Sequence, residues 1–275
     1  MTSSGNKKEF IKKVDSLCGR HSQWEIWKDM IWIFATSISN AVDRRHRENR
    51  ENRYMEIARN YRADEMDTFA QLFALMVNTF ELGGPQDFLG EMFMELGLGS
   101  DSGGQFFTPY SVCKMMAQLS MPEQAIKAKL EQARYITVND CAGGAGATLI
   151  AAADVILNGL KINYQPCALF TAQDIDYTTG LMCYIQLSVL GCAGYVRIGD
   201  TLSDPMTGHV LFGDGGETTW YTPMYFHGAW DMRRQAVVMR EQFKRIDRIM
   251  TEAPPPEDQP KRGSRFPAAI DTPPA

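Results

Sequence analysis

The sequence predicts a Rossmann-like α/β fold that follows an N-terminal helical domain. Three observations predict it: helical periodicity over the first hundred residues, a glycine-rich turn at 140–146, and an alternation of strand and helix patterns after that turn. With 275 residues and 44% hydrophobic content, the chain is long enough to bury a sizeable core.

The first part of the chain has the periodicity of amphipathic helices. Apolar residues recur at steps of three and four, first from Trp24 to Ile38 and again from Phe69 to Phe80. Breaks follow at Gly83 to Pro85 and at 97–104. We therefore expect a helical domain over residues 1–98.

A charged run at 43–53 lies between these helices and contains five arginines as well as Glu48 and Glu51. It has two interpretations. The mixed charges are typical of a solvated helix face with ion pairs, and the arginines also suit a patch that binds phosphate. We favour the solvated face.

The glycine-rich turn comes after an apolar strand pattern at 135–138. The strand stops at Asp140, and the chain turns through Gly143, Gly144 and Gly146 into an alanine-rich helix. Glycines permit a tight turn and close backbone approach to a ligand, and the amides at the helix start offer hydrogen bonds. Glycines also end strands for structural reasons alone, so the turn by itself indicates a nucleotide only weakly.

The segments around this turn complete an α/β domain over residues 99–250. Pro109 opens a helix before the turn, and helices are expected at 147–157 and 178–190, strands at 167–173 and 194–198, and one further helix at 230–250. Such alternation predicts a parallel sheet with crossover helices. Residues 251–275 are rich in proline and charge and are expected to be disordered.

Three aspartates stand where strands of this sheet should end. Asp140 follows the first strand, Asp174 the second and Asp200 the third. The carboxyl ends of parallel strands line the ligand crevice. A carboxylate after the second strand can accept hydrogen bonds from ribose hydroxyls, and one after the third can accept from the amine of adenine. Strand-end aspartates are also common helix N-caps, an alternative that stays open for each one.

Four motifs in this order resemble the adenine-N6 DNA methyltransferases of the kind found in type I restriction-modification modification subunits. The resembling segments are residues 105–109 (Gln-Phe-Phe-Thr-Pro), 140–146, 172–176 (Ala-Gln-Asp-Ile-Asp) and 199–202 (Gly-Asp-Thr-Leu). The resemblance covers roughly residues 66–224. It implies a Rossmann-like, S-adenosylmethionine-dependent methyltransferase fold.

The resemblance also implies cofactor contacts. Thr108 and the glycine turn would lie near the methionine end of S-adenosylmethionine, Asp174 at the ribose and Asp200 near the adenine. The cofactor-binding residues expected on this basis are Phe107, Thr108, Pro109, Asp140, Gly143, Gly144, Gly146, Asp174, Ile175 and Asp200.

This chain differs most from the family at the family's catalytic motif. The family has Asn or Asp, then Pro-Pro, then Tyr or Phe, which hold the adenine amine and stack on the flipped base. This chain has no Asn-Pro-Pro or Asp-Pro-Pro, and its nearest candidate is Thr222, Pro223, Met224, Tyr225. Tyr225 keeps the stacking ring, and the Thr222 hydroxyl and Pro223 carbonyl would position the amine. Smaller departures are Cys141 and Gly143, which replace the family's proline and cysteine.

The chain after this motif is shorter than the resemblance implies, because it has room for one helix and a tail. We expect either a trimmed domain or a partner or specificity subunit that completes the surface, in a homo- or hetero-oligomer. Two functions remain open: methyl transfer to adenine N6 in DNA, or a non-catalytic cofactor-binding scaffold that acts through a protein partner. A nicotinamide-dependent dehydrogenase fits less well, since the full GxGxxG spacing is absent.

The composition limits which binding partners and which cellular compartment we expect. The net charge of -5 argues against binding DNA through bulk positive charge, so DNA contacts should be local or shared with a partner. The six cysteines form no CxxC pair and no spacing suited to zinc, so we expect reduced thiols and no metal. We see no apolar run long enough for a membrane span and no signal-peptide core, and we expect a cytoplasmic protein.

Overall fold

The computed structural model describes residues 2–101 and 107–252. The chain divides into two compact units, Met1–Gln235 and Ala236–Ala275. The first unit holds a helical part and an α/β part. The boundary expected near residue 98 stays a prediction, and most of the expected tail lies outside the described residues.

A four-stranded sheet forms the centre of the α/β part, in the order β1-β2-β3-β4. The first three strands are parallel, and β4 runs antiparallel to β3. Buried side chains on both faces, as in β2, are typical of parallel strands covered by helices. The strands are β1 (Ile136–Asp140), β2 (Ala168–Asp174), β3 (Ala193–Ile198) and β4 (Thr219–Tyr221).

Helices account for most of the remaining described chain. Two short turns of other helix types also occur, η1 (Val155–Gly159) and η2 (Pro223–Phe226). The α-helices are α1 (Ser3–Leu17), α2 (Gln23–Asn40), α3 (Arg47–Ala58), α4 (Ala63–Gly83), α5 (Phe88–Glu95), α6 (Leu98–Asp101), α7 (Tyr110–Ser120), α8 (Glu123–Ala133), α9 (Ala147–Asp154), α10 (Tyr177–Val189) and α11 (Gly228–Glu252).

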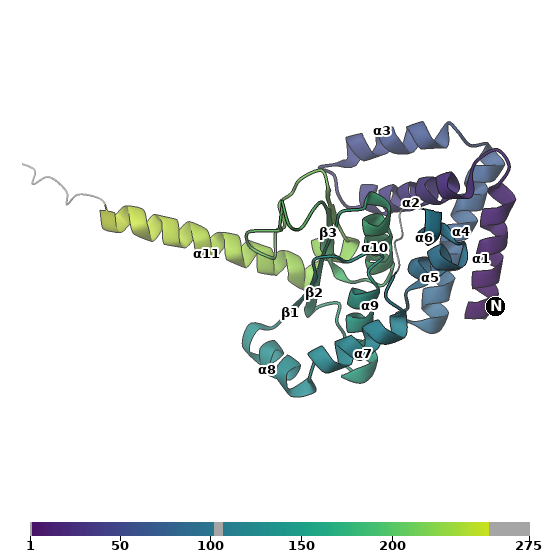
Figure 1. Cartoon of the computed structure of the whole chain (residues 1–275). Helices are drawn as coiled ribbons and strands as arrows, with labels where there is room; N and C mark the ends of the chain where they lie inside the picture. Colours follow the sequence, from purple (N-terminus) through teal and green to yellow (C-terminus); the bar gives the residue numbers. More distant parts are fainter. Residues whose placement is uncertain (1, 102–106, 253–275) are drawn as a thin grey trace, which may run out of the picture. The chain divides into compact units, whose positions relative to one another are not determined.

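The crossover helices α9 and α10 connect the parallel strands, as the alternating pattern predicts. Asp176 starts α10, because its carboxylate accepts a hydrogen bond from the Thr179 amide at 2.8 Å. Figure 1 shows α10 between the sheet and α2, and helix α10 packs on both. Almost every side chain of α10 is buried for this reason.

The helical part packs around aromatic side chains that follow the periodicity seen in the sequence. Phe10 of α1 lies edge-on to Phe88 of α5 at 5.1 Å between ring centroids, and Trp27 of α2 lies 5.8 Å from Phe93. All four side chains are fully buried. Helices α1, α2, α4 and α5 therefore share one core, which is continuous with that of the sheet.

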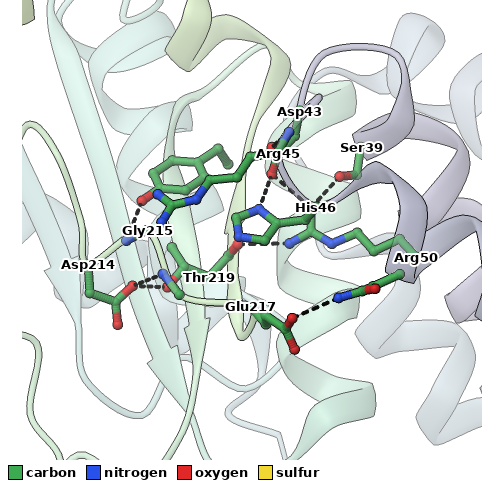
Figure 2. A network of polar contacts seen from close by, with 12 residues as sticks. Ser39, Asp43, Arg45, His46, Arg50, Asp214, Gly215, Glu217 and Thr219 are labelled. Atoms are coloured by element: carbon green, nitrogen blue, oxygen red, sulfur yellow. Dashed lines mark hydrogen bonds and ion pairs between the residues drawn. The ribbon is translucent and has the colours of Figure 1, made fainter.

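A buried arginine fastens the helical part to the sheet (Figure 2). Arg50 of α3 is only 4% exposed; its guanidinium pairs with Asp43 at 3.0 Å and donates to the Thr219 carbonyl of β4 at 2.9 Å. The same guanidinium lies over the Trp220 ring, 3.8 Å from its centroid. His46 Nδ1 contacts the same oxygen of the Asp43 carboxylate at 2.9 Å.

The contacts of Arg50 with Asp43, Thr219 and Trp220, called the Arg50 clamp below, change the interpretation of the charged run at 43–53. Arg53 pairs with Glu56 on the surface, as expected for a solvated helix face. Arg50 does not fit that interpretation, since it is buried and bonded to a strand far away in the sequence. The sequence analysis did not predict this contact, because no local pattern shows that the Thr219 carbonyl of β4 lies beside Arg50.

The second unit contains the C-terminal part of α11. Its apolar side chains Val238, Met239, Phe243 and Ile246 are exposed. No helix in the described part of the chain is both long and apolar enough to cross a bilayer.

Replacing Arg50 by alanine should destabilise the protein strongly. The change leaves the Asp43 carboxylate buried without its cation, which typically costs about 3–5 kcal/mol of the free energy of unfolding. Urea denaturation measures this. Arg53→Ala is the matched control on the same helix: its pair with Glu56 is exposed, so the loss should be below about 1 kcal/mol. Equal, small losses in both variants would contradict the Arg50 clamp.

Candidate functional site

The glycine turn is fixed to its surroundings by backbone and carboxylate hydrogen bonds. Asp140, the last residue of β1, accepts from the Ala142 amide at 3.0 Å and from the Thr148 hydroxyl of α9. The Gly143 amide donates to the Gln173 carbonyl of β2 at 3.0 Å. The turn is therefore held between the end of β1, the end of β2 and the start of α9.

Glycine is favoured at each of the three positions of the turn for a different structural reason. Gly144 has φ +51°, and a Cβ there would lie 3.4 Å from the Phe107 ring. Gly146 has φ +93°, and its Cβ would lie 2.8 Å from the Cys183 sulfur of α10. A Cβ on Gly143 would lie 3.2 Å from that of Ala172 on β2. Gly144 is thus favoured by its positive φ, whereas Gly143 and Gly146 permit close packing.

Asp174 faces the glycine turn from the end of β2. One carboxylate oxygen accepts from the Gly144 amide at 2.7 Å. The other accepts from the Asp176 amide at 2.9 Å and the Thr179 hydroxyl at 3.0 Å. These bonds hold the carboxylate, which is half-buried, against the turn.

A cavity of about 300 Å³ lies between the turn, the end of β2 and the segment before α7. Small residues of the turn and the first turn of α9 form one wall. Ile175, 72% exposed, supplies an apolar surface at the rim. The cavity is lined by Phe107, Thr108, Cys113, Asp140, Ala142, Gly143, Gly144, Ala145, Ala147, Thr148, Asp174, Ile175 and Thr179.

Seven of the ten residues expected around the cofactor meet in this cavity: Phe107, Thr108, Asp140, Gly143, Gly144, Asp174 and Ile175. Sequence reasoning missed Cys113, Thr148 and Thr179. Helical spacing offered a signal for Thr148, because it lies in the first turn of the helix after Gly146. Cys113 had none, since α7 reaches the cavity only through tertiary packing.

Three expected residues lie outside the lining. Gly146 packs on Cys183 instead, and Pro109 precedes α7 and lines a neighbouring cavity of about 390 Å³. Asp200 accepts hydrogen bonds from the Leu202 amide and the Ser203 hydroxyl, both at 2.9 Å, and these bonds lower its pKa. Gln105 and Phe106 of the first motif lie outside the described residues.

A buried amide connects the turn to the helical part. The Gln186 side chain, fully buried in α10, donates to the Ala145 carbonyl at 2.8 Å and to Asp87 at 2.9 Å. Its oxygen accepts from the Leu89 amide at 2.9 Å. Asp87 also caps α5 through the Gly90 amide. The position of the turn is thus tied to the start of α5.

The expected catalytic residues Thr222, Pro223 and Tyr225 do not lie at this cavity. Thr222 is fully buried; its hydroxyl donates to the Cys192 carbonyl at 2.7 Å and accepts from the Gly194 amide at 3.0 Å. Pro223 begins η2, and the buried Tyr225 hydroxyl donates to the Leu211 carbonyl at 2.8 Å.

The direction of β4 explains this placement. The sequence analysis chose Thr222 to Tyr225 as the nearest candidate for the family's motif and predicted no strand before it. Strand β4 runs antiparallel to β3 and ends beside Gly194, at the amino end of β3. The side chains satisfy the local backbone there, and the geometry does not support a working catalytic motif at this position.

Comparison with known proteins identifies the family. The model of the family described as N-6 DNA Methylase matches residues 89–246, more than half of the chain. The chain belongs to the N-6 DNA methylase family. This confirms the resemblance drawn from the motifs, and with it the predicted methyltransferase fold class. Comparison of the sequence with curated proteins gives no match.

Among solved structures, the chain is similar to the methyltransferase subunit of a type I restriction-modification system from Streptococcus thermophilus. The two are 14% identical with a TM-score of 0.42, and the similarity covers 76% of this chain and 61% of that one. This member of the N-6 DNA methylase family therefore spans less than two thirds of that subunit's length.

Gly146→Ala should destabilise the protein by about 1–3 kcal/mol, because the residue has a positive φ and its Cβ would overlap the Cys183 sulfur. Chemical denaturation measures the loss. Cys183→Ala in the same chain should recover part of it, which a double-mutant cycle would show as coupling between the two changes. Strictly additive losses would contradict the close contact.

The buried Asp87 predicts a pH-dependent stability. Burial raises the pKa of Asp87, so the folded protein binds this proton more tightly than the unfolded chain does. Wild-type stability should then fall as the pH rises from about 4 through that raised pKa. Asp87→Asn should melt higher relative to wild type at pH 7 than at pH 5, by scanning fluorimetry. A difference that does not change with pH would contradict this.

Proposed function

We propose that the cavity at the glycine turn binds S-adenosylmethionine. Asp174 would accept hydrogen bonds from the ribose, Ile175 would contact the adenine ring, and Thr108 with the glycine turn would face the methionine end. Asp200 stays a proposed adenine contact that requires its loop to rearrange. The observation that carries the proposal is the meeting of Phe107, the glycine turn and Asp174 around one cavity.

The residues present suit this cofactor. The cavity has the size of a small-molecule site, about 300 Å³ at the lower end of the usual range. Gly144 lines the cavity, and its positive φ, which favours glycine, turns the backbone there toward Asp174, to which its amide donates. The first amides of α9 lack intrahelical acceptors, as at every helix start, and can bind the cofactor's carboxylate.

We further propose that the protein acts in adenine-N6 methylation of DNA, in the cytoplasm and with a partner subunit. S-adenosylmethionine supplies the methyl group when bound, and this chain orients the cofactor and shields it from water. The acceptor for the adenine amine would come from a partner, since Thr222 and Tyr225 are buried elsewhere. Strand β1 has no second neighbour among the described strands, which leaves an edge for such a partner.

A second candidate is a non-catalytic, cofactor-binding subunit of the same system. The burial of Thr222 and Tyr225 favours it, because both hydroxyls are used by backbone carbonyls. Radiolabelled S-adenosylmethionine with DNA and candidate partner subunits separates the two. Label on adenine N6 supports the enzyme, and cofactor binding without transferred label supports the scaffold.

Asp174→Ala should weaken S-adenosylmethionine binding by at least roughly 100-fold, because it removes two charge-assisted hydrogen bonds to the ribose. Isothermal titration calorimetry measures the affinity, and circular dichroism checks the fold. Asp204→Ala is the matched control, an exposed carboxylate that pairs with Arg197 outside the cavity. Unchanged affinity in a folded Asp174→Ala protein would rule out the ribose assignment.

A further inference from the structure

A second cavity, of about 120 Å³, lies at the join of the helical part and the sheet. It is called the Trp32 pocket below. Trp32 of α2, Tyr177 of α10 and Trp220 of β4 form its walls, Arg50 lies among them, and Asn49 and Glu217 line it as well.

The walls are flat and already arranged. Trp32 and Tyr177 are stacked in parallel, with ring centroids 5.1 Å apart and an interplanar angle of 11°. Trp220 meets Trp32 edge-on at 5.7 Å. Trp32 and Tyr177 are only half-buried, so part of the stack faces the cavity. The facing sides of these two rings cover each other, so a base can only extend the stack from outside, and such stacking on aromatic rings depends little on sequence.

The Arg50 clamp (Figure 2) keeps these walls rigid. The Arg50 guanidinium lies over the Trp220 ring and is bonded to Asp43 and Thr219. Because its charge is already compensated, Arg50 supports the pocket rather than supplying a charge for a ligand. A preformed wall lowers the entropic cost of binding.

The exposed polar groups of the pocket suit a base better than a phosphate. Glu217 and Asn49 are exposed, and the Asn49 amide donates to the Glu217 carboxylate at 2.7 Å. A carboxylate accepts hydrogen bonds from exocyclic amines, such as those of adenine or cytosine, and repels phosphate. The pocket is also too small for a whole nucleotide, since ligand sites usually exceed about 300 Å³.

Cations for the sugar-phosphate chain stand beside the pocket. Arg44 and Arg47 lie within two residues of His46 in the sequence, and His46 also lines the pocket. Both arginines are exposed, and neither forms an ion pair within the part of the chain that the structure describes. They provide local positive charge on a chain whose net charge is -5.

We propose that the Trp32 pocket receives one unpaired base of DNA, which extends the stack of Trp32 and Tyr177, with Glu217 accepting from its amine and Arg44 and Arg47 facing the neighbouring phosphates. This rests on the proposed DNA substrate. Strand β4 is the strand farthest from β1, and the proposed methionine end of the cofactor lies beside the β1 turn. The stacked base is therefore a base other than the methylated adenine, and its stacking would fix the DNA in position.

Single-stranded DNA carrying 2-aminopurine tests the stacking, because this base loses fluorescence when it stacks on an aromatic ring. Wild type should quench the probe. Trp32→Leu should remove the quenching and weaken binding by roughly 5- to 150-fold. Trp24→Leu is the matched control: Trp24 is half-buried on the same helix and packs on Phe93, away from the pocket.

Surface variants keep the test valid if Trp32→Leu fails to fold. Glu217→Ala should abolish a preference for oligo-dA and oligo-dC over oligo-dT. Arg44→Ala with Arg47→Ala should lower the salt dependence of binding by about 1.4 in the slope of log K against log salt, since each single-strand phosphate contact contributes about 0.7.

Three results would overturn the proposal: quenching and affinity unchanged in folded Trp32→Leu, base preference and salt slope unchanged in the surface variants, or tighter binding of RNA of the same sequence. Failure of the proposed cofactor site is distinguishable, because it appears as absence of S-adenosylmethionine binding in calorimetry. A wild type that binds no DNA would overturn the pocket proposal as well.

Discussion

The side chain of Gln186 sets the geometry on which the rest of the site depends. Its amide group joins the carbonyl of Ala145 in the glycine turn, the Asp87 cap of α5 and the Leu89 amide, all inside the core. A buried amide is stable only when its donors and acceptors are satisfied together, so the three partners must keep their relative positions. The helical part therefore takes part in shaping the cavity proposed to bind the cofactor.

Local signals in the sequence predicted the fold and most of the cavity. Periodicity and glycine positions determine where β1, α9 and α10 begin, and the order of parallel strands brings Asp140 and Asp174 to one edge. Thr222 and Arg50 escaped prediction for the same reason. Their partners, the Cys192 carbonyl and the Thr219 carbonyl, depend on the antiparallel pairing of β4, which has three residues and no recognisable pattern.

The sequence analysis expected the cofactor-binding and catalytic residues to form one site, but the structure places these two sets of residues apart. The residues proposed to bind the cofactor meet around one cavity, whereas Thr222 lies where β4 ends beside the amino end of β3 and Tyr225 is buried in η2. In the assembly proposed above, this member of the N-6 DNA methylase family would bind the methyl donor, and a partner would supply the acceptor for the target amine. The edge of β1 that no described strand pairs with and the Trp32 pocket lie at opposite edges of the sheet, where a partner subunit and DNA would complete that assembly.

Hydrogen exchange followed by mass spectrometry, with and without S-adenosylmethionine, tests the central claim most directly. Binding at the glycine turn should slow exchange of the backbone amides in residues 139–148 and 174–179, and leave α1 and α4 unchanged. Protection confined to other segments, or none at a saturating cofactor concentration, would contradict the account.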